Sequence, residues 1–420
     1  MTSPASQPGR RDVRMRGFPD RAEVEEVIRL LDERVRPLPA EVVPVPQAGG
    51  RVLAAEVISE VAVPGFDRAA MDGYAVRAEE TFGAGPYNPL EWRVIGESLP
   101  GRPFAGQVPP GQAVRIMTGA PVPAGTDAVV PVEVAQETAG VLRVTEPVSP
   151  GRHVGRRGED IEPGRIVLSA GRVLRPQDLG LLASIGVGEV AVIRQPRVLI
   201  VTTGDELLPV GSKPQDFRIV DSNSVMLAAL VRRDGGQPGN CGLVPDRYEV
   251  VREAIRGCKA DVLLVSGGSS VGQEDHAPTI MAELGELPVH GIALRPASPT
   301  GVGFYDGRPV FLLPGNPVSC LCAYDLFAGR AIRKLGGRAP NLPYPRVQMA
   351  LTAKVSSAVG RVDYVRVRVR EGRAEPLAVS GASMLSTTTA SDGFVLVPRD
   401  SEGYPAGETV TVYLYDNPHE

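Results

Sequence analysis

Residues 260–268, ADVLLVSGG, decide the fold of the chain. Four apolar residues are followed by a serine and a glycine pair, which is typical of a parallel strand that is covered on both faces and ends in a sharp turn. A similar run, PRVLIVTT, occupies 196–203, and RPVFLL occupies 308–313. Segments with helical spacing separate these runs, so strands and helices alternate from about 197 to 337. This alternation predicts a doubly wound α/β domain, in which ligands bind outside the carboxyl ends of the strands.

The rest of the chain predicts β-rich accessory domains around this α/β domain. Apolar residues at helical spacing predict a helix over 20–36, with Asp20 as its N-cap. Valine-rich runs broken by proline and glycine predict a mostly β half from about 40 to 195, with one helix over 177–188. Within the α/β domain the expected helices are 221–236, 247–258, 276–285 and 318–337, and 289–294 is expected as a short strand.

Four modules are therefore expected. They are a mixed N-terminal subdomain over 20–58 plus 155–195, an inserted β-rich subdomain over 59–154, the α/β domain over 196–340 and a C-terminal β domain over 341–420.

The composition is that of a folded protein with several modules and excludes some classes of function. A length of 420 residues exceeds one ordinary core, and 48 glycines and 40 prolines without a period predict many turns. The 45 basic and 49 acidic residues give a net charge of -4, so no whole-chain field attracts nucleic acid or anionic lipid. No apolar run approaches the roughly 20 residues that span a bilayer, and no signal sequence is evident. We expect a cytoplasmic protein with no nucleic-acid or membrane partner.

The cysteines and histidines do not form a metal-binding pattern. The four cysteines include no Cys-x-x-Cys pair, and the four histidines are scattered along the chain. Reduced thiols in the core are the expectation.

Three loops at the ends of the predicted strands are candidates for binding a phosphate. They are 203–206, 267–272 and 314–317. Gly267 and Gly268 let backbone N–H groups approach an anion, and Ser269 and Ser270 add hydroxyl donors. A plain turn is the alternative for any one of these loops, but their common position favours a shared site.

Acidic residues accompany these loops: Asp205, Glu206, Asp221, Asp246 and Asp275. Simple helix capping is an alternative role for some of them, above all for Asp221 and Asp246. Carboxylates next to a polyphosphate repel it unless Mg²⁺ lies between them, so the combination predicts magnesium.

Two polar loops stand out in the first half of the chain. Residues 63–76 present Asp67 and Asp72, and residues 155–161 combine two arginines with Glu159 and Asp160. Solvated turns are the alternative interpretation of both loops.

Several motifs occur in one order: FDRAAMDGYAV, RIMTGAPVPAGTDAVVPVE, GRRGEDI, TTGDEL, SGGSSVG and LPGNPVS. With the spacing between them, they closely resemble the molybdopterin molybdenumtransferase (molybdenum insertase) family, which includes the C-terminal domain of gephyrin. The resemblance covers about 20 to 415. It implies an elongated homodimer of four-domain subunits, with a molybdopterin-binding α/β domain and a small C-terminal domain like a β-barrel.

The resemblance also implies a magnesium-dependent transferase of molybdenum cofactor biosynthesis. Such an enzyme takes adenylylated molybdopterin and molybdate, releases AMP and places molybdenum on the dithiolene sulfurs. It would contact the molybdopterin adenylyltransferase and client molybdoenzymes.

Matched position by position, the resemblance implies catalytic acids at Asp72, Asp160, Glu206, Asp246 and Asp275, with Glu206 and Asp275 as the magnesium ligands. The implied substrate-binding residues are Thr118, Gly204, Asp205, Gly267, Gly268, Ser269, Ser270, Arg295, Ser298, Pro314, Gly315, Asn316 and Pro317. In a dimer, Asp72 and Asp160 would complete the site of the partner subunit.

Residues 295–299 depart from the family pattern. The family usually has Lys-Pro-Gly-Lys-Pro where this chain has Arg-Pro-Ala-Ser-Pro, so Arg295 and Ser298 replace two lysines and one positive charge is lost. The alternative to an active insertase is therefore a non-catalytic paralogue that binds molybdopterin or its cofactor as a carrier or assembly partner. His276 stands where an aromatic residue is usual, and it is either an extra general acid or a packed residue at a helix start. Tungstate remains an alternative to molybdate.

Overall fold

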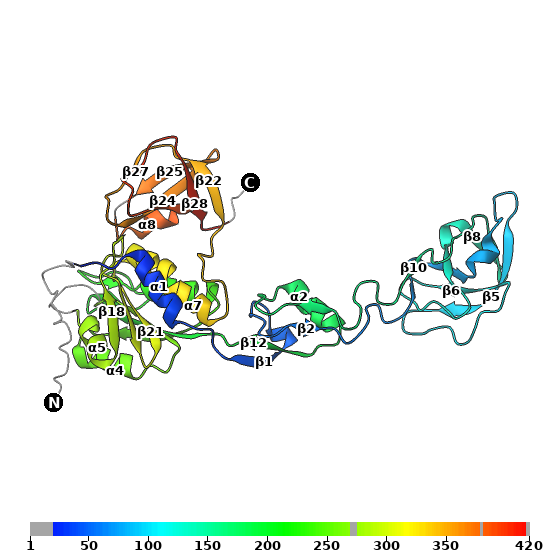
Figure 1. The fold of residues 1–420 in the computed structure, drawn as a ribbon, viewed down its shortest axis with the longest axis horizontal. Coiled ribbons are helices and arrows are strands. Elements are labelled where there is room, and N and C mark those ends of the chain that lie inside the picture. Colours follow the sequence, from blue (N-terminus) through cyan, green and yellow to red (C-terminus); the bar gives the residue numbers. More distant parts are fainter. Residues whose placement is uncertain (1–19, 269–274, 379–380, 417–420) are drawn as a thin grey trace, which may run out of the picture. The chain divides into compact units, whose positions relative to one another are not determined.

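A computed structural model describes residues 20–268, 275–378 and 381–416, which divide into two compact units (Figure 1). Unit 1 comprises the described residues up to Glu41, Gly50–Val52 and the chain from Ile193 onward. Unit 2 comprises Val42–Gly49 and Leu53–Val192.

The centre of unit 1 is a six-stranded sheet in the order β16-β13-β17-β21-β20-β18. Its strands are β13 (Arg197–Thr203), β16 (Gln237–Val244), β17 (Val262–Ser266), β18 (Glu286–His290), β20 (Gly301–Tyr305) and β21 (Arg308–Leu313). The first four strands in that order are mutually parallel, whereas β20 and β18 pair antiparallel. The parallel part confirms the predicted α/β class.

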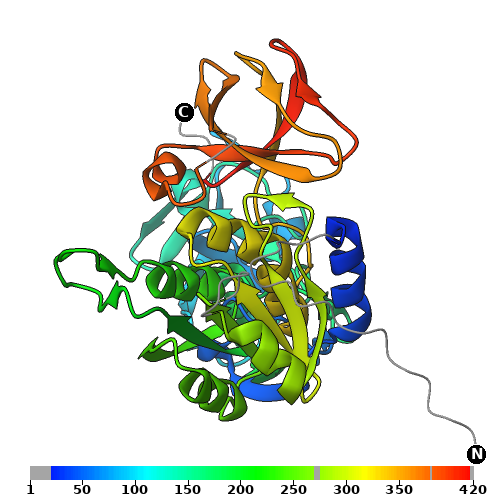
Figure 2. The ribbon, with the colours of Figure 1, turned by 90° about the vertical axis from the view of Figure 1, so that its left-hand side faces the viewer.

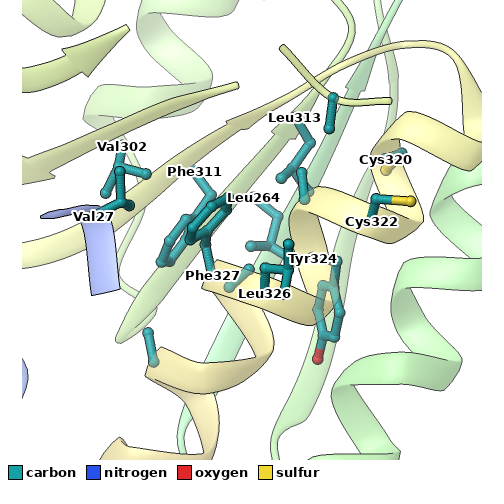
Figure 3. Packing of buried hydrophobic residues seen from close by; sticks show 14 of the residues in the cluster. Val27, Leu264, Val302, Phe311, Leu313, Cys320, Cys322, Tyr324, Leu326 and Phe327 are labelled. Atoms are coloured by element: carbon teal, nitrogen blue, oxygen red, sulfur yellow. The ribbon is translucent and has the colours of Figure 1, made fainter. Parts of the chain in front are cut away.

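Helices cover both faces of this sheet, which explains why its central strands are apolar throughout. The helices are α1 (Val24–Arg34), α3 (Asn223–Arg233), α4 (Tyr248–Arg256), α5 (Ala277–Leu284), α6 (Pro317–Ala323) and α7 (Gly329–Leu335). Alternate strand residues point to opposite faces. Ile200 and the strand residues on the same face therefore share a core with α1, α3, α6 and α7. Val201 and the strand residues on the opposite face share a core with α4 and α5. Figure 3 shows the first core, where Leu264 and Phe311 of the sheet lie against Phe327.

Three boundaries in unit 1 differ from the sequence prediction. The first helix begins at Val24 rather than near Asp20, because Glu23 is its N-cap and its N–H donates to Glu26 (3.0 Å). The predicted strand over 289–294 is divided, since β18 ends at His290 and β19 (Leu294–Arg295) pairs with another sheet. The predicted helix over 318–337 is interrupted by a π-helical segment, Tyr324–Ala328.

The C-terminal part of unit 1 is a small β domain, as predicted. Its main sheet has the order β19-β24-β26-β28-β22, with β25 paired to β24. The elements are β22 (Arg346–Ala350), β23 (Val355–Ser356), β24 (Val362–Arg370), β25 (Arg373–Ala378), α8 (Leu385–Thr389), β26 (Gly393–Val397), β27 (Gly403–Tyr404) and β28 (Thr409–Leu414). Parallel pairing of β19 with β24 ties this domain to the α/β domain.

Unit 2 is β-rich with one α-helix among its described residues, as its valine-rich runs predict. Its six-stranded sheet has the order β7-β4-β6-β5-β9-β8 and its own core around Trp92. A second core, around Leu182, lies among short strand pairs and α2. The elements are β1 (Ala40–Pro44), which begins in unit 1, β2 (Val57–Ile58), β3 (Arg68–Ala69), β4 (Gly73–Val76), β5 (Leu90–Ser98), β6 (Gln112–Ile116), β7 (Ala128–Pro131), β8 (Ala135–Thr138), β9 (Val141–Val144), β10 (Val154–Gly155), β11 (Ile166–Leu168), α2 (Pro176–Ser184), β12 (Glu189–Ile193) and the short 3₁₀ turns at Val45–Gln47, Ala78–Thr81 and Val132–Val134.

The four cysteines are all free thiols. Cys258, Cys320 and Cys322 are buried, as expected, but Cys241 is exposed, so the prediction of core thiols is wrong for that residue. In the described parts of the chain, no helix has the length and apolar character needed to cross a membrane.

Candidate ligand-binding site

The described residues of the three predicted loops meet at one cavity of about 840 Å³ in unit 1. The strands that lead into them, β13, β17 and β21, are neighbours in the sheet, so their carboxyl ends lie side by side. The lining residues are Thr202, Thr203, Glu206, Leu207, Ile219, Val220, Asp221, Ser222, Asn223, Asp246, Ser266, Gly267, Gly268, Asp275, Pro299, Pro314, Gly315, Asn316, Pro317 and Ser383. The structure therefore gathers most of the predicted residues of the α/β domain around one space.

The turn after β17 requires glycine at its first position. Gly267 has φ +98°, and a Cβ atom there would lie 2.1 Å from the carbonyl oxygen of Thr203. Its N–H donates to the Leu313 carbonyl (3.3 Å) and so joins this turn to β21. Gly268 has φ +55° but more room, with Thr203 Cγ2 at 3.5 Å from a built Cβ atom. Ser269 and Ser270 lie outside the described residues.

Asn223 connects the walls of the cavity, and sequence reasoning missed it. Its Nδ2 donates to Ser266 Oγ (2.9 Å) at the end of β17 and to the Gly315 carbonyl (2.7 Å) after β21. The carbonyl can only accept, so this contact fixes the orientation of the amide. The only available signal in the sequence was the position of Asn223 in the first turn of a predicted helix. That position is equally typical of a residue that caps a helix.

The cavity is lined by carboxylates and, among the described lining residues, by no lysine or arginine. The acids are Glu206, Asp221, Asp246 and Asp275. Asp221 Oδ1 accepts the N–H of Ser224 (3.0 Å), so Asp221 does cap α3. Asp246 does not cap α4, because Arg247 is the N-cap residue of that helix, and the Asp246 carboxylate accepts a hydrogen bond from Thr203 Oγ1. An anionic ligand therefore meets negative charge in this cavity unless a cation accompanies it.

These acids suit a magnesium ion that is shared with a ligand. Among the described residues, no group of three or more acidic, histidine or cysteine side chains could hold a metal alone. Mg²⁺ commonly takes one or two carboxylates and completes its shell with water and phosphate oxygens. Glu206 and Asp275 are two carboxylates that line the same cavity.

Among the described residues of the α/β domain, four predicted binding residues are absent from the cavity lining. Asp205 is exposed and accepts the N–H of Asp246 (3.2 Å), which organises the loop that carries this acid. Gly204 is buried. Arg295 forms an ion pair with Asp363, a fully buried residue of β24. Ser298 Oγ is buried without a hydrogen-bond partner among the described residues, and its neighbour Pro299 lines the cavity instead.

Ala297 is strained where the family usually has glycine. It has φ +105° and is 2% exposed. We expect Ala297→Gly to raise the free energy of unfolding by about 0.5 kcal/mol, because relief of about 1–2 kcal/mol of backbone strain exceeds the loss of one buried methyl group. Urea unfolding checks this, with Ala293→Gly as the matched control that should destabilise. A loss of stability in Ala297→Gly would contradict the strain.

The predicted residues of the first half form a separate cluster in unit 2. Asp72 Oδ1 accepts both the N–H and the hydroxyl of Thr118, each at 2.7 Å. Pairing of β10 with β3 brings residues 155–161 to the 63–76 loop, where Asp67 binds Arg156 (3.1 Å) and the N–H of Arg157 (2.8 Å). The Asp160 side chain is exposed nearby, and its N–H donates to the Val63 carbonyl (3.1 Å).

The Asp72–Thr118 contact makes a prediction about acid strength. The backbone N–H and then the hydroxyl of Thr118 lower the pKa of the exposed Asp72 carboxyl below its usual value. We expect Thr118→Val to raise this pKa partway back, because only the hydroxyl bond is lost, and Thr118→Ser to leave it lowered. A carbon-13 NMR titration of Asp72 measures both. An unchanged pKa in Thr118→Val would show that the hydroxyl contributes nothing.

His276 is packed at the start of α5. It is the N-cap residue of that helix, and its ring meets the Tyr248 ring edge-on with centroids 5.9 Å apart. It is not among the residues that line the cavity, although its neighbour Asp275 is. The geometry favours the packing role over that of a general acid.

Most of the chain matches models of known protein families. Residues 22–186 match the MoeA N-terminal region (domain I and II), 199–334 match a probable molybdopterin binding domain, and 348–415 match the MoeA C-terminal region (domain IV).

Named relatives cover nearly the full length. The chain is 34% identical to "Molybdopterin molybdenumtransferase 2" of Mycobacterium tuberculosis, over 93% of this chain and 98% of that protein. It is 34% identical to the molybdopterin molybdenumtransferase of Haemophilus influenzae, over 93% and 97%. A crystal structure of a molybdopterin biosynthesis MoeA protein from Pyrococcus horikoshii has a TM-score of 0.78 at 33% identity, over 94% of this chain and all of that one.

The fold, the cavity and these matches define a multidomain enzyme of molybdenum cofactor biosynthesis built around an α/β ligand-binding domain. The chain belongs to the molybdopterin molybdenumtransferase (MoeA) family of transferases.

Proposed function

We propose that the chain inserts molybdenum from molybdate into adenylylated molybdopterin, with Mg²⁺ and with release of AMP. The observation that carries this proposal is the cavity itself. Loops from three neighbouring strands surround about 840 Å³ that is lined by four acids and by no described lysine or arginine. Such a lining suits a phosphate ligand only when a divalent cation comes with it.

The residues of the cavity have distinct roles in this proposal. The phosphoanhydride of the substrate lies over the turn after β17, where Gly267 allows the sharp turn and Gly268 offers its backbone N–H. Glu206 and Asp275 would hold Mg²⁺, which would supply positive charge next to the phosphates. Asp246, oriented by the Thr203 hydroxyl, would position the oxygen atom that attacks the phosphoanhydride. Asn223 keeps the turn after β17 and the loop after β21 at a fixed separation.

The acids of unit 2 would act in the site of a second subunit. We propose that the chain is a cytoplasmic homodimer, in which Asp72, Thr118 and Asp160 complete the partner's site. Adenylylated molybdopterin would come from an adenylyltransferase, and the product would pass to client molybdoenzymes. Light scattering in solution measures the oligomeric state. A monomer that retains full activity would contradict the proposal that two subunits share a site.

An AMP-release assay tests the reaction. The full chain is mixed with adenylylated molybdopterin, molybdate and Mg²⁺, and AMP is quantified by chromatography. We expect Glu206→Gln and Asp275→Asn to lower the rate at least about 100-fold, because each removes a carboxylate charge that would hold Mg²⁺ beside the phosphates. Glu249→Gln is the matched control, since Glu249 lies on α4 and its side chain is 74% exposed.

The assay also decides between the enzyme and a carrier. One observation favours a carrier: Arg295, the remaining cation of the altered loop, is engaged by Asp363 rather than by the cavity. A carrier would bind the adenylylated pterin tightly without releasing AMP. AMP release coupled to the appearance of active cofactor supports the insertase, and binding without release contradicts it.

A further inference from the structure

The turn that follows β13 contacts the loop that follows β16 through three consecutive residues. Thr203 lies beside Val244 in the parallel register of the two strands, so the two loops leave the sheet next to each other. The N–H of Gly204 donates to the Val244 carbonyl (3.4 Å). Thr203 Oγ1 donates to the Asp246 carboxylate, and Asp205 Oδ1 accepts the N–H of Asp246 (3.2 Å). The backbone and the side chain of Asp246 are therefore both held by the turn after β13.

Asp205 lies outside the cavity, although the resemblance to the family implies a substrate-binding residue. It is exposed and is not among the residues that line the cavity. It belongs to the segment between β13 and α3, which contains β14 (Leu207–Leu208) and β15 (Ile219–Val220) and which Figure 2 shows in green, standing away from the α/β body. Its contact with the N–H of Asp246 needs an acceptor oxygen and does not need a negative charge.

The position of Asp246 depends on this contact. Asp246 precedes Arg247, the N-cap residue of α4, whose side chain makes no capping hydrogen bond. Asp205 therefore holds the start of this helix from another strand, as a capping residue would. Asp246 Oδ1 lies 3.8 Å from a Cβ atom built on Gly268, so the carboxylate is next to the turn to which the proposed function assigns the phosphate. A displacement of about 1 Å at such a place can lower a rate strongly.

We propose that Asp205 is a positioning residue that acts through Asp246 and does not touch the substrate. This proposal rests on the proposed function, because it gives Asp205 a task in that reaction. Asp205 fixes the backbone of Asp246, whereas the Thr203 hydroxyl fixes its carboxylate. The acceptor oxygen of Asp205 carries this role, and its charge does not.

Two substitutions of Asp205 separate the acceptor from the charge. Asparagine keeps an acceptor oxygen, and alanine removes both the acceptor and the charge. In the AMP-release assay of the full chain, we expect Asp205→Ala to lower kcat about tenfold, with KM for adenylylated molybdopterin within about twofold of the parent value. Asp205→Asn should keep kcat within about threefold of the parent value. A direct ligand of Mg²⁺ would need the carboxylate, so equal losses in the two variants would overturn the proposal.

Amide hydrogen exchange measures the contact without the reaction. We expect the amide of Asp246 to exchange about three- to tenfold faster in Asp205→Ala than in the parent chain, because one hydrogen bond is lost. In Asp205→Asn the exchange should be as slow as in the parent chain. An unchanged exchange rate in Asp205→Ala would overturn the proposal.

Glu249→Ala is the matched control. Glu249 is an acid in the first turn of α4 with a side chain that is 74% exposed, so this substitution also removes a negative charge at the start of the helix. It does not line the cavity, and kcat and the exchange of the Asp246 amide should match the parent chain. A loss of kcat as large as in Asp205→Ala would assign the effect to charge at the helix start and overturn the proposal. Failure of the parent chain to release AMP would instead contradict the proposed function, and the positioning role would fall with it.

Discussion

Gly267→Ala is expected to lower the free energy of unfolding by about 2–4 kcal/mol and to weaken AMP binding more than about tenfold. Two independent costs add at this position. The added Cβ atom would lie 2.1 Å from the Thr203 carbonyl oxygen, so the backbone must move by more than side-chain adjustment allows. The φ of +98° is also unfavourable for any residue with a Cβ atom. Both effects displace the Gly268 amide that the proposal assigns to the phosphate.

Gly268→Ala is the matched control for this prediction. Its φ of +55° costs about 1 kcal/mol for alanine, but the nearest atom to the new Cβ lies at an ordinary 3.5 Å. We therefore expect a smaller loss of stability than in Gly267→Ala. Urea unfolding and AMP titration measure both variants. If the two substitutions have equal and small effects, the turn does not have the described geometry.

Asp325→Ala is expected to destabilise unit 1 by about 3–5 kcal/mol. Asp325 is fully buried in the π-helical segment and contacts Arg233 Nη2 (3.0 Å) and the Tyr344 hydroxyl (3.0 Å). Burial raises the pKa of this carboxyl, and the Arg233 guanidinium opposes that effect. Removal of the carboxylate leaves a largely buried arginine and a buried hydroxyl without this partner, which is costly in a low-dielectric interior.

Glu286→Ala provides the comparison for this ion pair. Glu286 pairs with Arg34 at a similar distance of 3.0 Å, but its side chain is 62% exposed. Water screens such a pair, so we expect a loss below about 1 kcal/mol. Urea unfolding followed by circular dichroism measures both variants. A loss in Asp325→Ala no larger than that in Glu286→Ala would show that the buried network does not stabilise the unit.

The sequence predicted the α/β domain well because its strands are covered on both faces. Short continuous apolar runs such as 197–203 and 262–266 are typical of buried parallel strands. The glycine pair at 267–268 marks the end of the second run. β16 was missed because its sequence, QPGNCGLV, contains a proline and two glycines and has no continuous apolar run, which an edge strand can lack. The π-helical segment was missed because its apolar spacing continues that of α6.

The candidate site was predicted only in part. The loops and acids of the α/β domain could be predicted because they follow strands directly. Asn223, Pro299 and Ser383 could not, since they reach the cavity through tertiary contacts. The N–H of Val318 donates to the Ala382 carbonyl (3.0 Å), for example, and this contact joins the segment that carries Ser383 to the start of α6. Arg295 was predicted as a substrate-binding residue, but its partner Asp363 lies 68 residues away in the sequence.

The most direct test of the central claim is a crystal structure of the chain with AMP and Mg²⁺. The account predicts that the phosphate lies within hydrogen-bonding distance of the Gly268 amide, with the metal between it and the carboxylates of Glu206 and Asp275. Electron density for AMP at another place on the chain, or a phosphate in this cavity bound away from that turn, would contradict it.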